Sequence, residues 1–323
     1  MKIIVDIFGS DDPARLLTGC ALCTVQLPEV TLVLTGDEAR LRQMLSGHTY
    51  APERIELMHA PELITNDDDP IEAVMHRRDS SLVAGIVRMR SDPEIVGMLT
   101  AGSTGAAYAA GVAFAGRLPG VHTPTLATFL PSMTGRNVCL ADCGANINCK
   151  PDRLAQFALQ GVALMQAEGV EHPCVGLLSV GVEEHKGNPF TQEAFAALSA
   201  LPIDFAGNME ARDALTGKYD VIVSDGFSGN VLLKTVESAG LFAGHRLRML
   251  SNGDTVTETA ADKLTQELDF ASNGAAMLLG LRKPLLKAHG SATERTVPNA
   301  VRQLLRLRES DFPQRLNVLL RKL

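Results

Sequence analysis

The stretch that decides the fold is Asp142-Cys143-Gly144-Ala145-Asn146-Ile147-Asn148-Cys149-Lys150. The apolar run Asn137–Ala141 precedes it and is short enough for a buried strand. A helical pattern follows, with apolar or small residues at spacings of three and four from Leu154 to Met165, and Pro151 suits the first turn of that helix. The stretch is therefore a loop between a strand and a helix, and such loops bind ligands in open parallel sheets. Taken alone, it is equally consistent with a tight turn in which a buried aspartate caps backbone groups.

Strand-like and helix-like segments alternate along the whole chain. Short apolar runs predict strands near residues 2–7, 31–35, 54–58, 94–99, 124–130, 137–141, 174–180, 203–206 and 219–224. Alternation with helices is typical of a mostly parallel, doubly wound α/β sheet. No repeat, low-complexity tract or evident linker interrupts the pattern, so we expect residues 1–323 to form a single domain.

Composition excludes several classes of protein. The net charge of −7 argues against a general nucleic-acid binder. No run of about 18 apolar residues predicts a membrane span, and the chain begins directly with a strand, Met1–Asp6, rather than a signal peptide. Six scattered cysteines suit a reducing compartment. We therefore expect a cytoplasmic protein.

A glycine- and hydroxyl-containing loop follows the predicted strand at 94–99. It contains Gly102, Ser103 and Thr104 and opens a helix of small residues that runs through Ala115. Backbone N–H groups at such a helix start can hold an anion. The Gly-Lys-Ser/Thr ending of a P-loop is absent, and close packing of a small-residue helix on a sheet explains the composition equally well.

Three further polar loops follow strands in the second half of the chain, namely Gly181–Asn188, Gly207–Asp213 and Asp225–Asn230. If the sheet is parallel, these loops meet at one edge. Lys186 supplies a cation, and Gly207-Asn208 and Gly226–Asn230 supply neutral donors, which together could bind a small oxyanion and stabilise a developing one. Nucleophile-elbow, zinc and dinucleotide signatures are absent from the sequence. The residues alone thus predict an α/β enzyme with an anionic substrate.

Several segments in their order along the chain carry a more specific signal: Asp142–Asn146, Cys149–Pro151, Gln156–Ala158, Val175–Leu178, Glu183–Asn188, Gly207–Asp213 and Asp225–Val231, closed by Lys287, His289, Gly290 and Ser291. Together they resemble the bacterial acyl-acyl-carrier-protein:phosphate acyltransferases, the PlsX family. The resemblance implies a fold similar to phosphate acetyltransferases and isocitrate dehydrogenases, and a homodimer. It implies transfer of a fatty acyl group from acyl carrier protein to inorganic phosphate, giving acyl phosphate for phospholipid synthesis.

The implied chemistry requires no cofactor, metal or covalent nucleophile. Phosphate is already nucleophilic near neutral pH and a thiolate is a tolerable leaving group, so positioning and charge stabilisation carry most of the rate. We hypothesise that Lys186 neutralises phosphate, whereas Asn208 and Asn230 donate to phosphate or to the thioester oxygen. His289 would donate to the oxyanion or to the leaving sulfur. A surface lysine and a helix-start histidine are the plain alternatives for Lys186 and His289.

Other candidate residues would bind or frame the substrate: Gly102, Ser103, Thr104, Asp142, Asn146, Asp225, Gly226 and Ser228. Asp142 and Asp225 are expected to orient loops rather than to transfer protons. The first loop, Phe8–Pro13, departs from the family's Met-Gly-Gly-Asp-x-Ala-Pro pattern, and Ser103 stands where asparagine is usual. Asn273–Ala276 replaces a Gly-Gly-Ala-Pro pattern.

Two regions concern partners. Residues 251–271 predict a loop and an acidic exposed helix, where family members often carry a more hydrophobic and basic stretch associated with membranes, so peripheral membrane contact stays open. Residues 295–323 predict basic amphipathic helices broken near Pro313. These helices could pack on the sheet with solvated charges, meet an acidic carrier protein, or lie on an anionic membrane.

Two other functions remain open. One is a phosphate acetyl- or butyryltransferase that uses coenzyme A thioesters. The other is a catalytically weakened paralogue that binds acyl carrier protein without turnover. The altered Phe8–Pro13 loop is the reason for this alternative.

Overall fold

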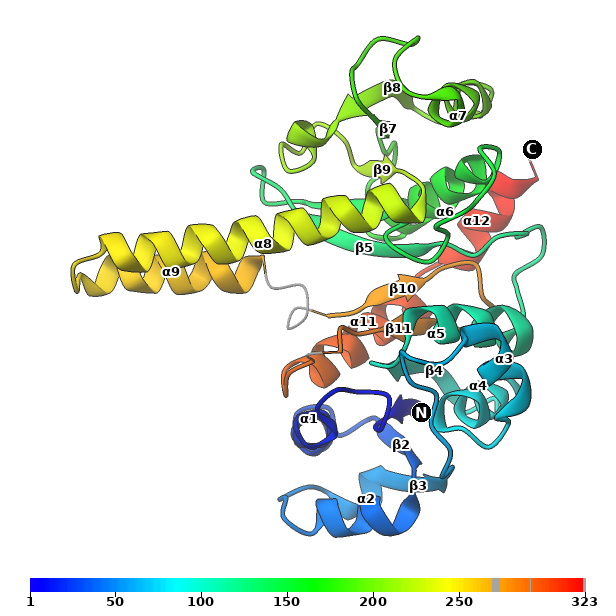
Figure 1. Cartoon of the computed structure of the whole chain (residues 1–323). Coiled ribbons are helices and arrows are strands. Elements are labelled where there is room, and N and C mark those ends of the chain that lie inside the picture. Colours follow the sequence, from blue (N-terminus) through cyan, green and yellow to red (C-terminus); the bar gives the residue numbers. More distant parts are fainter. Residues whose placement is uncertain (269–273, 291, 322–323) are drawn as a thin grey trace. The chain divides into compact units, whose positions relative to one another are not determined.

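The computed structural model describes residues 1–268, 274–290 and 292–321 (Figure 1). Contacts between Cα atoms divide the chain into two compact units. Unit 1 comprises Met1–Leu118 with Ala271–Ser310, and unit 2 comprises Pro119–Phe270 with Asp311–Leu323. The single domain expected over 1–323 stays a prediction. Ser291, Asn273 and the end of the predicted acidic helix at residues 269–271 lie outside the described residues.

The strands of unit 1 lie in the order β3-β2-β1-β4-β11-β10. Their bounds are Ile55–His59, Thr31–Gly36, Lys2–Asp6, Ile95–Thr100, Leu285–Lys287 and Ala276–Leu278 respectively. All these pairings are parallel except β10 with β11. Asp6, Thr100 and Lys287 are in register at the carboxyl ends of adjacent strands. Residues that follow these strands therefore share one edge of the sheet.

The helices of unit 1 are α1 Pro13–Gln26, α2 Glu38–Leu45, α3 Pro70–His76, α4 Ser81–Ser91, α5 Thr104–Ala110 and α11 Thr296–Glu309, with short turns η1 Pro52–Arg54 and η2 Gly111–Ala115. In several of them an aspartate or serine side chain just before the helix accepts a hydrogen bond from the first turn. These capping residues are Asp12, Asp37, Asp69, Ser80 and Ser103.

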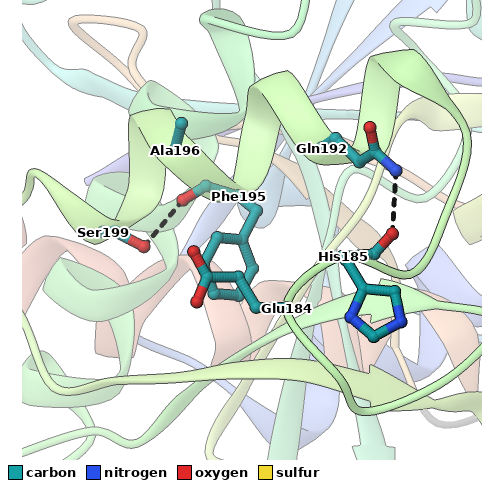
Figure 2. A pocket seen from close by; sticks show the side chains of 6 residues that line it. All are labelled: Glu184, His185, Gln192, Phe195, Ala196 and Ser199. Carbon is teal, nitrogen blue, oxygen red and sulfur yellow. Dashed lines mark hydrogen bonds between the residues drawn. The ribbon is translucent and has the colours of Figure 1, made fainter.

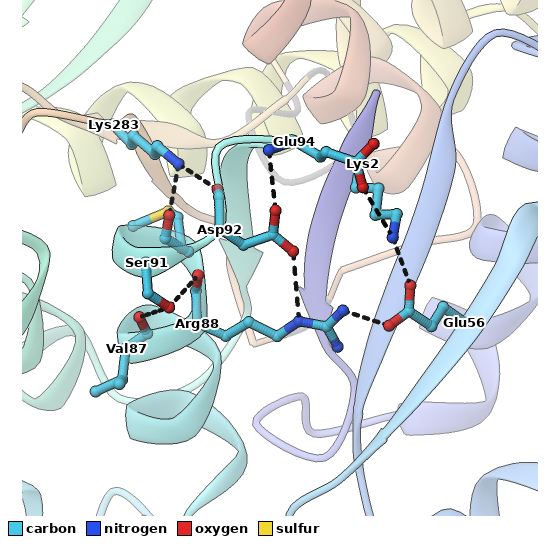
Figure 3. A network of polar contacts seen from close by, with 9 residues as sticks. Lys2, Glu56, Val87, Arg88, Ser91, Asp92, Glu94 and Lys283 are labelled. Carbon is cyan, nitrogen blue, oxygen red and sulfur yellow. Dashed lines mark hydrogen bonds and ion pairs between the residues drawn. The ribbon is translucent and has the colours of Figure 1, made fainter.

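A polar network ties together the amino-terminal ends of strands in unit 1 (Figure 3). Lys2 Nζ lies 3.1 Å from a carboxylate oxygen of Glu56 and 3.3 Å from one of Glu94. Glu56 also pairs with Arg88 of α4. Lys283 Nζ donates to two carbonyl oxygens at the carboxyl end of α4, at 2.7 and 2.6 Å. The network thus joins β1, β3, α4 and the segment before β11, away from the strand ends that carry the candidate residues.

The strands of unit 2 lie in the order β5-β6-β9-β7-β8. Their bounds are Leu126–Pro131, Asn137–Ala141, Val221–Val223, Val175–Ser179 and Phe205–Glu210 respectively. β5 and β6 are antiparallel neighbours, whereas β6, β9, β7 and β8 are all parallel. Parallel pairing predominates in both units, which confirms the predicted class of sheet.

The helices of unit 2 are α6 Arg153–Ala167, α7 Pro189–Ser199, α8 Gly226–Leu250, α9 Thr255–Glu267 and α12 Phe312–Leu320, with the short turn η3 Ala211–Asp213. α6 is almost wholly buried and α12 packs against it. α8 and α9 lie side by side as a hairpin (Figure 1), and α9 is the acidic, exposed helix that the sequence predicts. Among the described helices, none combines the length and apolar character needed to cross a membrane.

Two boundaries near the candidate site differ from the prediction. β8 continues to Glu210, so Gly207 and Asn208 belong to the strand and not to the following loop. The strand extends because β7 stays paired with β8 up to Ser179 and Glu210. α8 begins at Gly226 rather than near 230, because the Asp225 side chain accepts backbone hydrogen bonds from the first turn.

Candidate functional site

The loop after β6 is organised by Asp142, whose side chain is fully buried. One carboxylate oxygen accepts from the backbone N–H groups of Gly144 and Ala145, both at 2.7 Å. The other accepts from the Leu126 N–H at 2.9 Å and from the Asn146 carboxamide at 2.7 Å. With its oxygens engaged in this way, Asp142 ties together the backbone of its own loop and the start of β5.

This loop packs closely against the amino-terminal end of α8. The Gly226 N–H donates to the Asn146 carbonyl at 3.0 Å. A Cβ atom at Gly229 would lie 1.8 Å from the Asp142 carbonyl oxygen, so only glycine permits this approach. A Cβ atom at Gly144 would lie 3.5 Å from Oδ1 of Asn230. The structure therefore brings Asp142, Asn146, Gly226 and Asn230 together.

The side chains of Asp225 and Ser228 are hydrogen-bonded to each other at the start of α8. Asp225 Oδ1 accepts from the backbone N–H groups of Phe227 and Ser228, both at 2.9 Å, and Oδ2 accepts from the Ser228 hydroxyl at 2.8 Å. This is a helix cap. Ser228 thus already uses its hydroxyl proton within the protein, whereas the nearby Asn230 side chain is exposed.

The loop after β7 carries Lys186, whose side chain is exposed. Its turn is held from two sides. The Asn208 carboxamide, on β8, donates to the Glu183 carbonyl at 2.8 Å, and the Gln192 carboxamide, on α7, donates to the His185 carbonyl at 2.8 Å. Because β6, β9, β7 and β8 are parallel, this loop and the Asp142 loop leave the same edge of the unit 2 sheet.

A pocket of about 450 Å³ lies between this loop and α7 (Figure 2). Phe195 lines it and packs edge-on against Phe205 of β8, with ring centroids 5.3 Å apart. Glu184 and His185 reach it from the loop, whereas Gln192, Ala196 and Ser199 reach it from α7. The pocket combines an aromatic wall with exposed polar side chains.

The remaining candidates belong to unit 1. The Gly102 N–H donates to the Thr100 hydroxyl at 3.1 Å, and the Ser103 hydroxyl caps α5 by accepting from the Ala106 N–H at 3.4 Å. Thr104 is the first residue of that helix. His289 is exposed and follows β11. These residues share the carboxyl edge of the unit 1 strands, but they are in a different unit from Lys186, Asn208 and Asn230.

A buried carboxylate supports this edge of unit 1. Asp6 is 1% exposed and accepts from the Ser81 hydroxyl at 2.7 Å and the Thr100 hydroxyl at 2.8 Å. Burial raises the pKa of Asp6, against the opposing effect of these hydrogen bonds, the Gly9 N–H and the Lys287 charge. A Cβ atom at Gly9 would lie 2.6 Å from Asp6 Oδ2 and 3.0 Å from Gly102 Cα. Asp6 therefore shapes the Phe8–Pro13 loop and its approach to Gly102.

Sequence reasoning missed Asp6, Ser179 and Gln192 as parts of these edges. The sequence could have identified Asp6, because it ends a strand directly before a glycine-containing loop, as Asp142 does. The sequence signal for Gln192 was weaker: Asn188 followed by Pro189 predicts a helix start just before it. No sequence signal identified Ser179, because its burial depends on the turn that folds over it.

Comparison with known proteins adds independent information. A family model described as "Fatty acid synthesis protein" matches residues 1–315. A protein from Brevibacillus brevis named phosphate acyltransferase is 39% identical over 320 residues, which cover 96% of this chain and 95% of that protein.

Solved structures confirm the fold. A phosphotransacetylase from Streptococcus pyogenes is similar with a TM-score of 0.64 and 16% identity, covering 98% of this chain and 94% of that one. A 4-hydroxythreonine-4-phosphate dehydrogenase from Klebsiella pneumoniae is similar with a TM-score of 0.55 and 13% identity, covering 95% and 99%. At these identities the likeness concerns the fold alone.

Proposed function

Because this chain belongs to the family of fatty acid synthesis proteins and is an acyltransferase, we propose that it transfers a fatty acyl group from acyl carrier protein to inorganic phosphate. The product is acyl phosphate for phospholipid synthesis. The phosphate acyltransferase from Brevibacillus brevis, which matches almost end to end, supports phosphate as the acceptor. The observation that carries the proposal within the structure is the exposed Lys186 on a turn fixed by Asn208, at the carboxyl edge of parallel strands.

The reaction needs an oxygen of phosphate to attack the thioester carbonyl carbon. The carbonyl electrons move to oxygen, and the tetrahedral intermediate then expels the thiolate, so that a C–O bond replaces a C–S bond. Lys186 attracts the phosphate and lowers the repulsion between the anion and the developing oxyanion. Asn230, exposed beside the Asp142 loop, donates to phosphate or to the thioester oxygen.

We also propose roles for the candidate residues of unit 1. His289 would donate a proton or hydrogen bond to the oxyanion or to the leaving sulfur. Gly102, Ser103 and Thr104 would contact substrate at the start of α5. Asp142, Asn146, Asp225, Gly226 and Ser228 would frame the substrate chiefly by fixing backbone positions, because their polar atoms make the loop contacts described above.

The deciding experiment offers the purified chain phosphate together with acyl carrier protein thioesters, long-chain acyl-coenzyme A or short-chain acyl-coenzyme A, and detects acyl phosphate by mass spectrometry. We expect product from the carrier-protein donor, unaffected by a chelator. Product from short coenzyme A donors alone would favour a phosphate acetyl- or butyryltransferase. Carrier-protein binding without product would favour the weakened paralogue. Loss of activity on adding a chelator, restored by one divalent ion, would contradict a metal-free reaction.

We further propose a homodimer in the cytoplasm. Apolar side chains along the α8–α9 hairpin are exposed in the single chain and would suit either a second copy or a membrane surface. They are Val231, Leu241, Phe242, Met249, Leu250 and Val256. Sedimentation of the purified chain with and without anionic vesicles distinguishes the two, because a dimer forms without lipid.

A further inference from the structure

Two buried side-chain oxygens in unit 2 have no hydrogen-bond partner among the described residues. They are Oγ of Ser179 and Oδ1 of Asn208. Asn208 is only 2% exposed. Native proteins seldom leave buried polar atoms unsatisfied, and exceptions often mark a functional position. Ser179 and Asn208 are therefore candidates for direct contact with a ligand.

The two atoms lie close to one another in the fold. In the parallel pair β7–β8, Leu177 is opposite Asn208 and Ser179 is opposite Glu210. Since side chains alternate between the faces of a sheet, Ser179 and Asn208 belong to the same face. The turn that carries Lys186 covers both. Asn208 Nδ2 donates to the Glu183 carbonyl, and a Cβ atom at Gly187 would lie 3.2 Å from Ser179 Oγ.

The orientation of the Asn208 carboxamide follows from its partner. The Glu183 carbonyl can only accept, so the nitrogen of the carboxamide must face it at 2.8 Å and the oxygen must face away. A carboxamide oxygen also only accepts. A ligand that satisfies Oδ1 must therefore bring a hydrogen-bond donor, whereas Ser179 Oγ can either donate or accept.

We propose that Asn208 Oδ1 accepts a hydrogen bond from the P–OH group of hydrogen phosphate, while Ser179 donates to another oxygen of the same anion. The inference rests on the proposed function, and it assigns Asn208 and Ser179 to phosphate recognition. Hydrogen phosphate and sulfate are both tetrahedral dianions, and Lys186 attracts either. Only hydrogen phosphate carries a proton near neutral pH, so an acceptor at this position selects phosphate and rejects sulfate.

Access to the two atoms requires the part of the turn around Gly187, which lies against Ser179 Oγ, to move while Glu183 keeps its contact with Asn208. Gly187 has a φ of 100°, a backbone conformation that glycine adopts readily. Movement of the turn would also carry Lys186, so anion binding and placement of the cation would occur together.

The test is a calorimetric titration of the whole chain with phosphate, arsenate and sulfate. Arsenate carries a proton as phosphate does. The wild-type chain should bind phosphate and arsenate more tightly than sulfate. Asn208→Leu should weaken binding of phosphate and arsenate by roughly 3- to 10-fold, as for one lost hydrogen bond, and leave sulfate unchanged. Ser179→Ala should weaken all three anions by a similar factor.

Ser91→Ala is the matched control, since its exposed hydroxyl bonds only to carbonyls of its own helix; its anion affinities should equal those of wild type. Equal affinities of the wild-type chain for phosphate and sulfate would overturn the inference without any variant, even if Asn208→Leu failed to fold. Equal losses of affinity for all three anions in Asn208→Leu would also overturn the inference. A chain that binds phosphate selectively but forms no acyl phosphate would contradict the proposed function alone.

Discussion

The carboxamide of Asn146 donates to the carboxylate of Asp142 at 2.7 Å and to the carbonyl of Pro124 at 3.0 Å. Both side chains are buried, and the first contact spans a single turn of the loop after β6. The Pro124 contact fixes that loop to the segment before β5. The loop is thus shaped by the protein before any substrate arrives, as positioning catalysis requires.

The first prediction concerns this carboxylate. Asp142→Ala should lower the free energy of unfolding by about 3 kcal/mol or more, because several buried N–H donors lose their acceptor. Asp225→Ala is the matched control. It removes a partly exposed helix cap and should cost only about 1 kcal/mol. Urea denaturation measures both, and equal losses would show that Asp142 does not hold the loop.

The second prediction concerns pH and Asp6. Burial raises the pKa of Asp6 above the value of 3.8 expected in the unfolded chain. A raised pKa means that the folded state binds a proton which the unfolded state releases. The contribution of Asp6 to stability is therefore complete below pH 3.8 and is lost as pH rises through the folded-state pKa.

The measurement compares wild type with Asp6→Asn in urea over a pH series that starts below 3.8. The wild-type chain should lose stability relative to the variant as pH rises, because ionisation of the buried Asp6 carboxyl group destabilises only the wild type. Ser81 and Thr100 can reorient their hydroxyls toward a neutral carboxamide. A difference that stays constant with pH would contradict the raised pKa.

The strand–loop–helix unit around Asp142 was predictable because its signals are local. An apolar run, a polar loop and Pro151 mark its boundaries to within a few residues. The role of Asn208 was less accessible, since its place inside β8 depends on pairing with β7. Ser179 shows the limit more sharply. Its burial comes from a turn that folds over it, and no local pattern encodes that contact.

The third prediction concerns Lys186. Lys186→Ala should raise the KM for phosphate about tenfold or more and lower kcat, because a charge-assisted contact to the anion is lost. Folding should change little, since the side chain is exposed. Lys186→Arg should rescue activity only in part, because a planar fork replaces a compact charge. Lys263→Ala, which changes an exposed lysine on α9, is the control. Wild-type kinetics in Lys186→Ala would make Lys186 an ordinary surface residue.

The last prediction concerns α11, whose buried face packs in unit 1 while Arg306 and Arg308 remain exposed. Acyl carrier proteins are acidic, and opposite charge speeds encounter in a way that salt weakens. Reversing both arginines to glutamate should slow the reaction with a carrier-protein donor and flatten its salt dependence. A minimal thioester donor without the carrier protein should be affected much less. Arg42 of α2, which is exposed and already pairs with Glu38, supplies the control reversal. Equal losses on both donors would indicate a folding defect, and unchanged rates would leave these arginines as solvated charges.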